Sequence, residues 1–163
     1  MVNKVAIAGL FLVFMGLVAA ILFPVFAKVH SGGGPNRVSV HLEHLALALQ
    51  QYAQDNNDLL PPMQDALTAR RALASYAVSN EWGTQTPADN FVNPFTNEAF
   101  EPNPVLSGKP LKSFKRLTRQ QTIAFYDARP YNDGGHTVLM LNGSVKFISA
   151  TQWVTIKRIS KLP

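Results

Sequence analysis

The histidines are the first residues of this 163-residue sequence whose spacing could support chemistry. His41 and His44 lie three positions apart in a segment with helical periodicity, so both imidazoles would share one side of a helix and could bind one metal ion. His30 precedes them, but no fourth ligand accompanies the group, and we expect no metal site. His136 stands alone among β-forming residues, where a structural role is expected.

Other chemical motifs are weaker. Asp55-Asn56-Asn57-Asp58 resembles part of a calcium loop but lacks its spacing and terminal glutamate, so we interpret it as a turn that ends a helix. The sequence has no Gly-x-Ser-x-Gly motif, no phosphate-binding glycine loop and no zinc motif. Without cysteine it can form neither a disulfide nor a thiolate metal site. We therefore predict no catalytic residues, no cofactor and no enzyme activity.

A basic run is the remaining candidate for binding. No acidic residue occurs between Pro102 and Tyr126, and Phe114 lies inside the run. Such a run could contact nucleic-acid phosphates or anionic lipid headgroups, but a solvated surface is the expected explanation, and a nucleic-acid partner is not expected. The net charge of +5 and the basic residues at 157, 158 and 161 add only weak support. The possible polyanion contacts are Lys109, Lys112, Lys115, Arg116 and Arg119.

An uninterrupted apolar run, Val5 to Phe26, precedes all of these residues and is bracketed by Lys4 and Lys28. About 20 apolar residues suffice for a helix to cross a membrane, so we predict a transmembrane anchor at residues 1–28. A cleaved signal peptide is the alternative, but its apolar core is about 7–15 residues long, which is shorter than this run. The flanking charges do not settle the orientation.

The rest of the chain predicts a hinge and one small α+β domain. Three glycines and a proline between Ser31 and Asn36 place a hinge at residues 29–38, and the domain occupies 39–163. Asn142-Gly143 between two β-rich segments predicts a hairpin with a type I′ turn. The expected elements are helices at 39–57, 63–78 and 151–159, a loop-rich stretch at 81–110, and strands at 122–127, 136–141 and 144–148.

Three segments, in order, carry a family resemblance: residues 20–27 (AILFPVFA), 42–62 (LEHLALALQQYAQDNNDLLPP) and 133–148 (DGGHTVLMLNGSVKFI). Together they resemble type IV pilin-like proteins, or pseudopilins, of the subgroup with the prepilin-type processing-associated domain. The resemblance implies a pilin-like fold, in which an amphipathic helix packs on a small antiparallel sheet closed by a C-terminal hairpin. Some pseudopilins bind calcium in a loop, which would point to Asp127 and Asp133 here.

The sequence also departs from that family. Alignment on Pro24 puts the processing glycine of the family at Val2 and its docking glutamate at Ile7, so neither residue is present. The signature His, nine residues, Asp-Gly falls on Asn132 and on Asn142-Gly143, where both polar side chains are amides. Asparagine still suits the turn, so the fold is expected to persist while a charge-dependent role is lost.

The resemblance implies a structural or accessory subunit of a type IV pilus or type II secretion-like filament. Its partners would be other pilin-like subunits, or copies of itself, and membrane lipid, with the domain outside the cytoplasmic membrane or in an extracellular filament. The alternative is a membrane-tethered binding module for DNA, polysaccharide or protein, which the hinge favours. The expected assembly residues are Val5, Leu10, Phe14, Leu17, Ile21, Phe23, Pro24 and Phe26.

Overall fold

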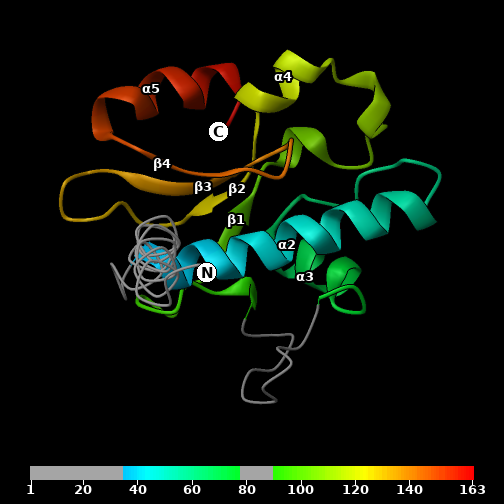
Figure 1. The fold of residues 1–163 in the computed structure, drawn as a ribbon, viewed down its shortest axis with the longest axis horizontal. Coiled ribbons are helices and arrows are strands. Elements are labelled where there is room, and N and C mark those ends of the chain that lie inside the picture. The colour runs from blue at the N-terminus through cyan, green and yellow to red at the C-terminus, as the bar shows by residue number, and fades with distance from the viewer. Residues whose placement is uncertain (1–34, 78–89) are drawn as a thin grey trace, which may run out of the picture. The chain divides into compact units, whose positions relative to one another are not determined.

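The computed structural model describes residues 35–77 and 90–163, and Asn36–Pro163 form one compact unit (Figure 1). Its helices are α2 (Pro35–Asp55), α3 (Ala66–Leu73), α4 (Arg116–Gln121) and α5 (Ala150–Ile159), with short 3-10 turns η3 (Pro104–Leu106) and η4 (Leu111–Ser113). The strands are β1 (Phe100–Pro102), β2 (Ile123–Asp127), β3 (His136–Met140) and β4 (Val145–Ile148). The described part of the chain is therefore α+β, as the sequence predicts.

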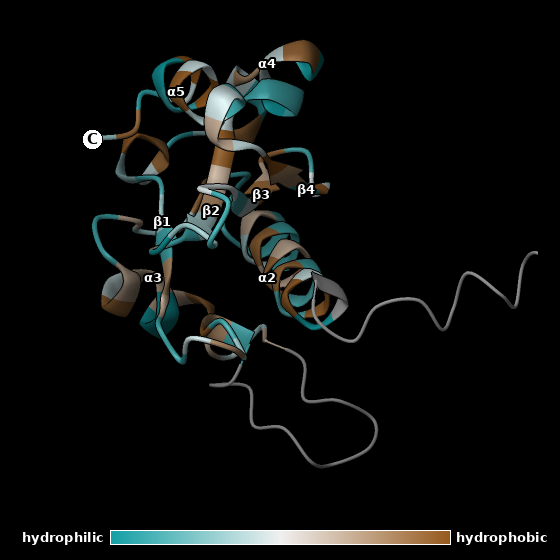
Figure 2. Ribbon diagram, turned by 90° about the vertical axis from the view of Figure 1, so that its left-hand side faces the viewer, coloured by the Kyte–Doolittle hydropathy of each residue, from teal (hydrophilic) through white to brown (hydrophobic). Residues whose placement is uncertain are grey.

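The four strands form one antiparallel sheet in the order β1-β2-β3-β4. Helix α2 lies on one side of the sheet and α5 on the other (Figure 1). All five residues of β3 are buried, because helices cover both faces of this strand. Figure 2 accordingly shows hydrophobic residues along β2 and β3. The sheet thus separates two apolar layers.

The larger apolar layer lies between α2 and the sheet. Leu42 and Leu45 of α2 are fully buried in it, together with Phe125 of β2 and Leu139 of β3. The smaller layer contains Ile123, Val138, Met140 and Ile148, against which Trp153 and Ile156 of α5 pack. Alternate residues of β3 therefore pack in opposite layers, because successive side chains of a strand point to opposite faces of the sheet.

The predicted fold class is wrong in its first element. In residues 35–77 and 90–163 no helix is both long and apolar enough to cross a membrane. Helix α2 has 21 residues, but only one of its faces is apolar, and Arg37, Glu43 and Asp55 lie along the rest. It is therefore a packing helix. The predicted anchor at 1–28 and its eight assembly residues fall outside the described residues.

Helix boundaries differ from the predicted ones at both ends of α2. The helix begins at Pro35 instead of Ser39, because proline is tolerated in the first turn, where its missing N–H has no partner to lose. Residues 35–38 of the expected hinge therefore belong to α2, and the others are not described. Asn57 and Asp58, with φ of 55° and 66°, end the helix in the left-handed conformation that the expected turn requires.

The hairpin forms at the predicted place but with a different turn. Gly143 has a φ of 87°, whereas Asn142 is not among the residues with positive φ, so the turn is not type I′. The Gly143 N–H donates to the carbonyl of Met140 at 2.9 Å, which makes a three-residue loop with glycine in the left-handed position. One positive φ, at glycine, is enough to reverse the chain here.

Candidate functional site

A cluster of buried polar groups surrounds Asp127 at the end of β2. This carboxylate is 2% exposed. Its Oδ1 accepts a hydrogen bond from Nδ2 of Asn93 at 2.6 Å, and its Oδ2 accepts from the N–H of Thr137 at 3.0 Å. Asp127 therefore connects two parts of the fold. Asn93, 34 residues away in the sequence, lies in the segment that precedes β1, and Thr137, 10 residues away, lies in β3.

Burial raises the pKa of Asp127, while the hydrogen bonds from Asn93 and Thr137 act in the opposite direction. A general base needs access to a substrate proton, and this carboxylate is enclosed by its own donors. The hydroxyl of Tyr131 closes the cluster through a 3.0 Å hydrogen bond with Oγ1 of Thr137. The arrangement fits a structural cross-link better than a catalytic acid. No group of three acidic or histidine side chains that could hold a metal ion occurs here or elsewhere among the described residues.

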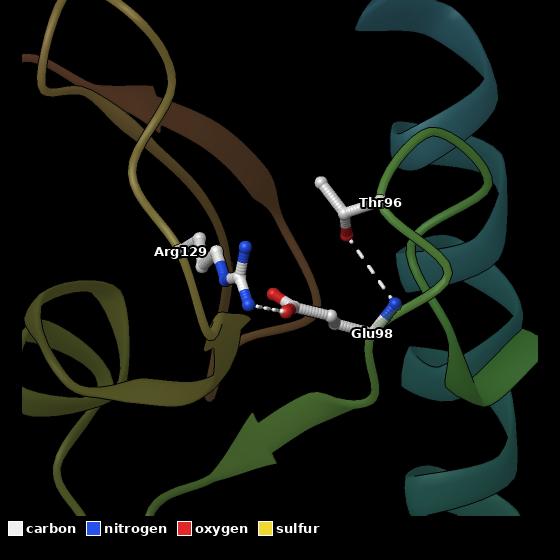
Figure 3. A network of polar contacts seen from close by, with 3 residues as sticks. All are labelled: Thr96, Glu98 and Arg129. Carbon is white, nitrogen blue, oxygen red and sulfur yellow. Dashed lines mark hydrogen bonds and ion pairs between the residues drawn. The ribbon is translucent and has the colours of Figure 1, made fainter.

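A second carboxylate lies beside this cluster. Oε1 of Glu98 forms an ion pair with Arg129 at 2.7 Å, and the backbone N–H of Glu98 donates to Oγ1 of Thr96 at 3.3 Å (Figure 3). Oε2 of Glu98 is buried without a hydrogen-bond partner. Because the Arg129 side chain is 74% exposed, the pair contributes little stability. Its effect is to hold the loop before β1 against the segment that follows β2.

His136 is structural, as its isolation predicts. Its ring stacks on Trp153 of α5, with centroids 3.9 Å apart. Its Nδ1 lies 3.1 Å from the carbonyl oxygen of Asp127. A carbonyl can only accept, so Nδ1 carries the hydrogen in this contact. His136 therefore supports α5 on the sheet.

His41 and His44 are both held by one loop. Nδ1 of His41 lies 2.9 Å from the carbonyl oxygen of Val92, and Nδ1 of His44 lies 3.0 Å from Oδ1 of Asn90. Both rings are thus turned toward the segment that leads to β1. His30 lies outside the described residues. The expectation of no metal site remains a prediction for the chain as a whole.

The predicted calcium-like segment is also accounted for by local structure. Oδ2 of Asp58 accepts from the N–H of Lys112 at 2.7 Å, and its carbonyl accepts from the N–H of Leu111 at 2.7 Å. Nδ2 of Asn56 donates to the carbonyl of Tyr52 at 2.9 Å. These bonds end α2 and attach η4 to it. Asp133 accepts a hydrogen bond from the N–H of Gly135 in the turn before β3.

The five predicted polyanion contacts lie on one continuous segment, from Lys109 to Arg119. Four of them are exposed, and Arg119 is half-buried. Within the described parts of the chain, the ion pair between Arg129 and Glu98 is the one that forms, so none of these five cations is neutralised by a carboxylate. The structure therefore leaves their charges available to a ligand.

Comparison with protein-family models, with curated proteins and with solved structures finds no match to this chain.

Two polar residues that organise the fold gave no sequence signal. Asn93 and Asn103 lie in the stretch expected to be loop, and both are buried. Nδ2 of Asn103 donates to the carbonyls of Ile123 and Ser160, each at 2.9 Å. The partner Ser160 is 57 residues away, so no local pattern could reveal the contact. In a proline-rich stretch, asparagine predicts only a turn.

Proposed function

We propose that this chain is a non-catalytic, pilin-like subunit that assembles into a type IV pilus or type II secretion-like filament. The observation that carries the proposal is the packing of α2, by one apolar face, on an antiparallel sheet closed by the 140–145 hairpin. The sequence places the apolar segment Val5 to Phe26 before this helix, with eight residues between them. An assembly segment and a compact outer domain would then occupy consecutive parts of the chain.

Assembly would be driven by burial of the apolar segment between neighbouring subunits. Burying one large aliphatic or aromatic side chain is worth about 1.5–3 kcal/mol. Side chains such as Phe14, Leu17 and Ile21 would together outweigh the cost of holding a subunit in place. The domain would remain outside the cytoplasmic membrane and line the filament surface.

A specific observation favours a second candidate, a tethered binding module. Helix α2 begins at Pro35, immediately after Gly32, Gly33 and Gly34. Three consecutive glycines at this point suit a domain that moves on a tether, whereas a filament core suits a continuous helix. The cations of Lys109 to Arg119, which form no ion pair with a carboxylate among the described residues, would then provide the binding surface.

One pair of variants separates the two candidates. Phe14→Arg places a charge in the apolar segment, and Phe147→Arg places the same charge on the domain surface, where the native side chain is 53% exposed. If the chain assembles, Phe14→Arg should reduce its amount in sheared filaments at least tenfold, because a charge in an apolar interface costs more than about 1.4 kcal/mol. Phe147→Arg should leave that amount unchanged.

Total protein in the cell is measured alongside, so that loss of the variant itself is recognised. Equal amounts of both variants in the filament fraction would contradict assembly through the apolar segment. Absence of the unmodified chain from that fraction would contradict the filament proposal and leave the tethered module.

A further inference from the structure

The segment Lys109 to Arg119 is held rigidly against the domain by its backbone. The carbonyl of Lys109 accepts from the N–H of Leu60 at 2.9 Å, and that of Arg119 accepts from the N–H of Asn142 at 3.1 Å. Between these points, the half-buried Leu111 and Phe114 pack against the larger apolar layer. The apolar side chains thus fix the segment and leave its charged ones outside.

The outer side of this segment combines charge with an exposed aliphatic residue. Lys115 and Arg116 are exposed at the start of α4, and Leu117 beside them is 73% exposed. Figure 2 shows the same mixture as teal and brown on α4. Leu117 has the most exposed of the large hydrophobic side chains among the described residues.

The end of helix α5 adds a second group of exposed cations beside an exposed aliphatic side chain. Oγ of Ser160 donates to the carbonyl of Gln121 at 3.3 Å, so the end of α5 meets the end of α4. Both figures show the two helices side by side (Figures 1 and 2). Arg158 and Lys161 are exposed there, and Ile159 is 47% exposed. No Asp or Glu occurs after Asp133, so this part of α5 brings cations alone.

We propose that these residues bind a membrane surface rich in anionic phospholipid. The α4–α5 surface is defined by Lys115, Arg116, Leu117, Arg158, Ile159 and Lys161. Its cations would pair with phosphate headgroups, and Leu117 and Ile159 would enter the boundary between headgroups and acyl chains. Beside the basic segment, Oδ2 of Asp58 already accepts a hydrogen bond from the N–H of Lys112.

The exposed aliphatic residues favour lipid over nucleic acid. Single-stranded nucleic acid is bound on aromatic side chains that stack with the bases, and the α4–α5 surface contains no aromatic residue. Contact with a phosphate backbone in water does not bury leucine or isoleucine side chains, whereas insertion into a bilayer removes them from water and is favourable in free energy. The inference goes beyond the proposed function and holds whether or not the chain enters a filament.

The absence of native cysteine permits a direct test with one fluorescent label. Full-length chain carrying Thr118→Cys is labelled with an environment-sensitive fluorophore and mixed with lipid vesicles. We expect the emission to shift to the blue in mixed phosphatidylcholine–phosphatidylglycerol vesicles and not in phosphatidylcholine alone. The shift should reverse in high salt, which screens exposed charges. A label at Gln51→Cys, an exposed position of α2, should not respond.

Charge variants complete the test. Lys115→Gln/Arg116→Gln/Arg158→Gln should lower the ratio of docked to undocked domains about 100-fold, since each cation near an anionic surface contributes about fivefold. The matched control, Arg37→Gln/Arg70→Gln/Arg71→Gln, removes three exposed cations elsewhere and should have little effect. An equal response in neutral vesicles, or equal losses in both variants, would overturn the proposal. A shift with duplex DNA but not with vesicles would also overturn it, in favour of nucleic acid.

Discussion

Replacing Asp127 with alanine is expected to destabilise the domain by about 2–6 kcal/mol. The substitution removes both acceptors of the cluster and leaves the Nδ2 group of Asn93 and the N–H of Thr137 buried without partners. Each buried, unsatisfied donor costs about 1–3 kcal/mol. Urea unfolding of the full-length chain in mild detergent, followed by circular dichroism, measures the change.

The same carboxylate sets a pH dependence with a definite sign. Because burial raises the pKa of Asp127 in the folded state, the folded protein binds this proton more tightly than the unfolded one. The contribution of Asp127 to the unfolding free energy is therefore greatest below its ordinary pKa of 3.8 and falls as the pH rises through the raised value. Asp127→Asn should lack this fall and retain one of the two acceptor oxygens.

Asp133→Ala is the matched control for Asp127→Ala. Asp133 also accepts a hydrogen bond from a backbone N–H, that of Gly135 at 2.9 Å, but it is exposed, so water can replace it. Its loss should cost no more than about 1 kcal/mol. If the two alanine variants were equally stable, the Asp127 cluster would not be the cross-link described above.

Asn103→Ala is expected to cost about 2–4 kcal/mol and to loosen α5 selectively. The fully buried Asn103 donates to the carbonyls of Ile123 and Ser160, and its Oδ1 accepts from the N–H of Val105 at 3.1 Å. Alanine leaves these three groups buried without this partner. Hydrogen exchange should quicken first in α5, since Ser160 ends that helix.

The control for Asn103→Ala is Asn142→Ala, at an exposed turn position where Oδ1 accepts from the N–H of Ser144 at 3.1 Å. Its cost should stay near 1 kcal/mol, and exchange in α5 should not change. Unaltered α5 exchange in Asn103→Ala would show that Asn103 does not anchor the helix.

The sequence predicts well those elements whose signals are local. Helix α2 follows from its apolar periodicity, and β3, β4 and their hairpin follow from β-rich segments around Asn142-Gly143. Helix α4 was missed because its six residues are too short to show periodicity. Strand β1 was missed because it lies in a proline-rich stretch and is defined by pairing with β2, some twenty residues later.

The polar contacts of the candidate sites could not be predicted in the same way. The pairing of Asn93 with Asp127 depends on the bend that brings β1 beside β2, which no short pattern encodes. The basic run is visible in the sequence, but its combination with exposed aliphatic side chains and with the end of α5 is not. Exposure of Leu117 and the approach of α5 through Ser160 are tertiary features.

The most direct test of the proposed function is the location and N-terminal mass of the unmodified chain in its native host. Sheared filaments and membranes are separated, and the N-terminal peptide is measured by mass spectrometry in each fraction. We expect the chain in the filament fraction. A chain that retains Met1 and occurs in membranes alone would contradict filament assembly.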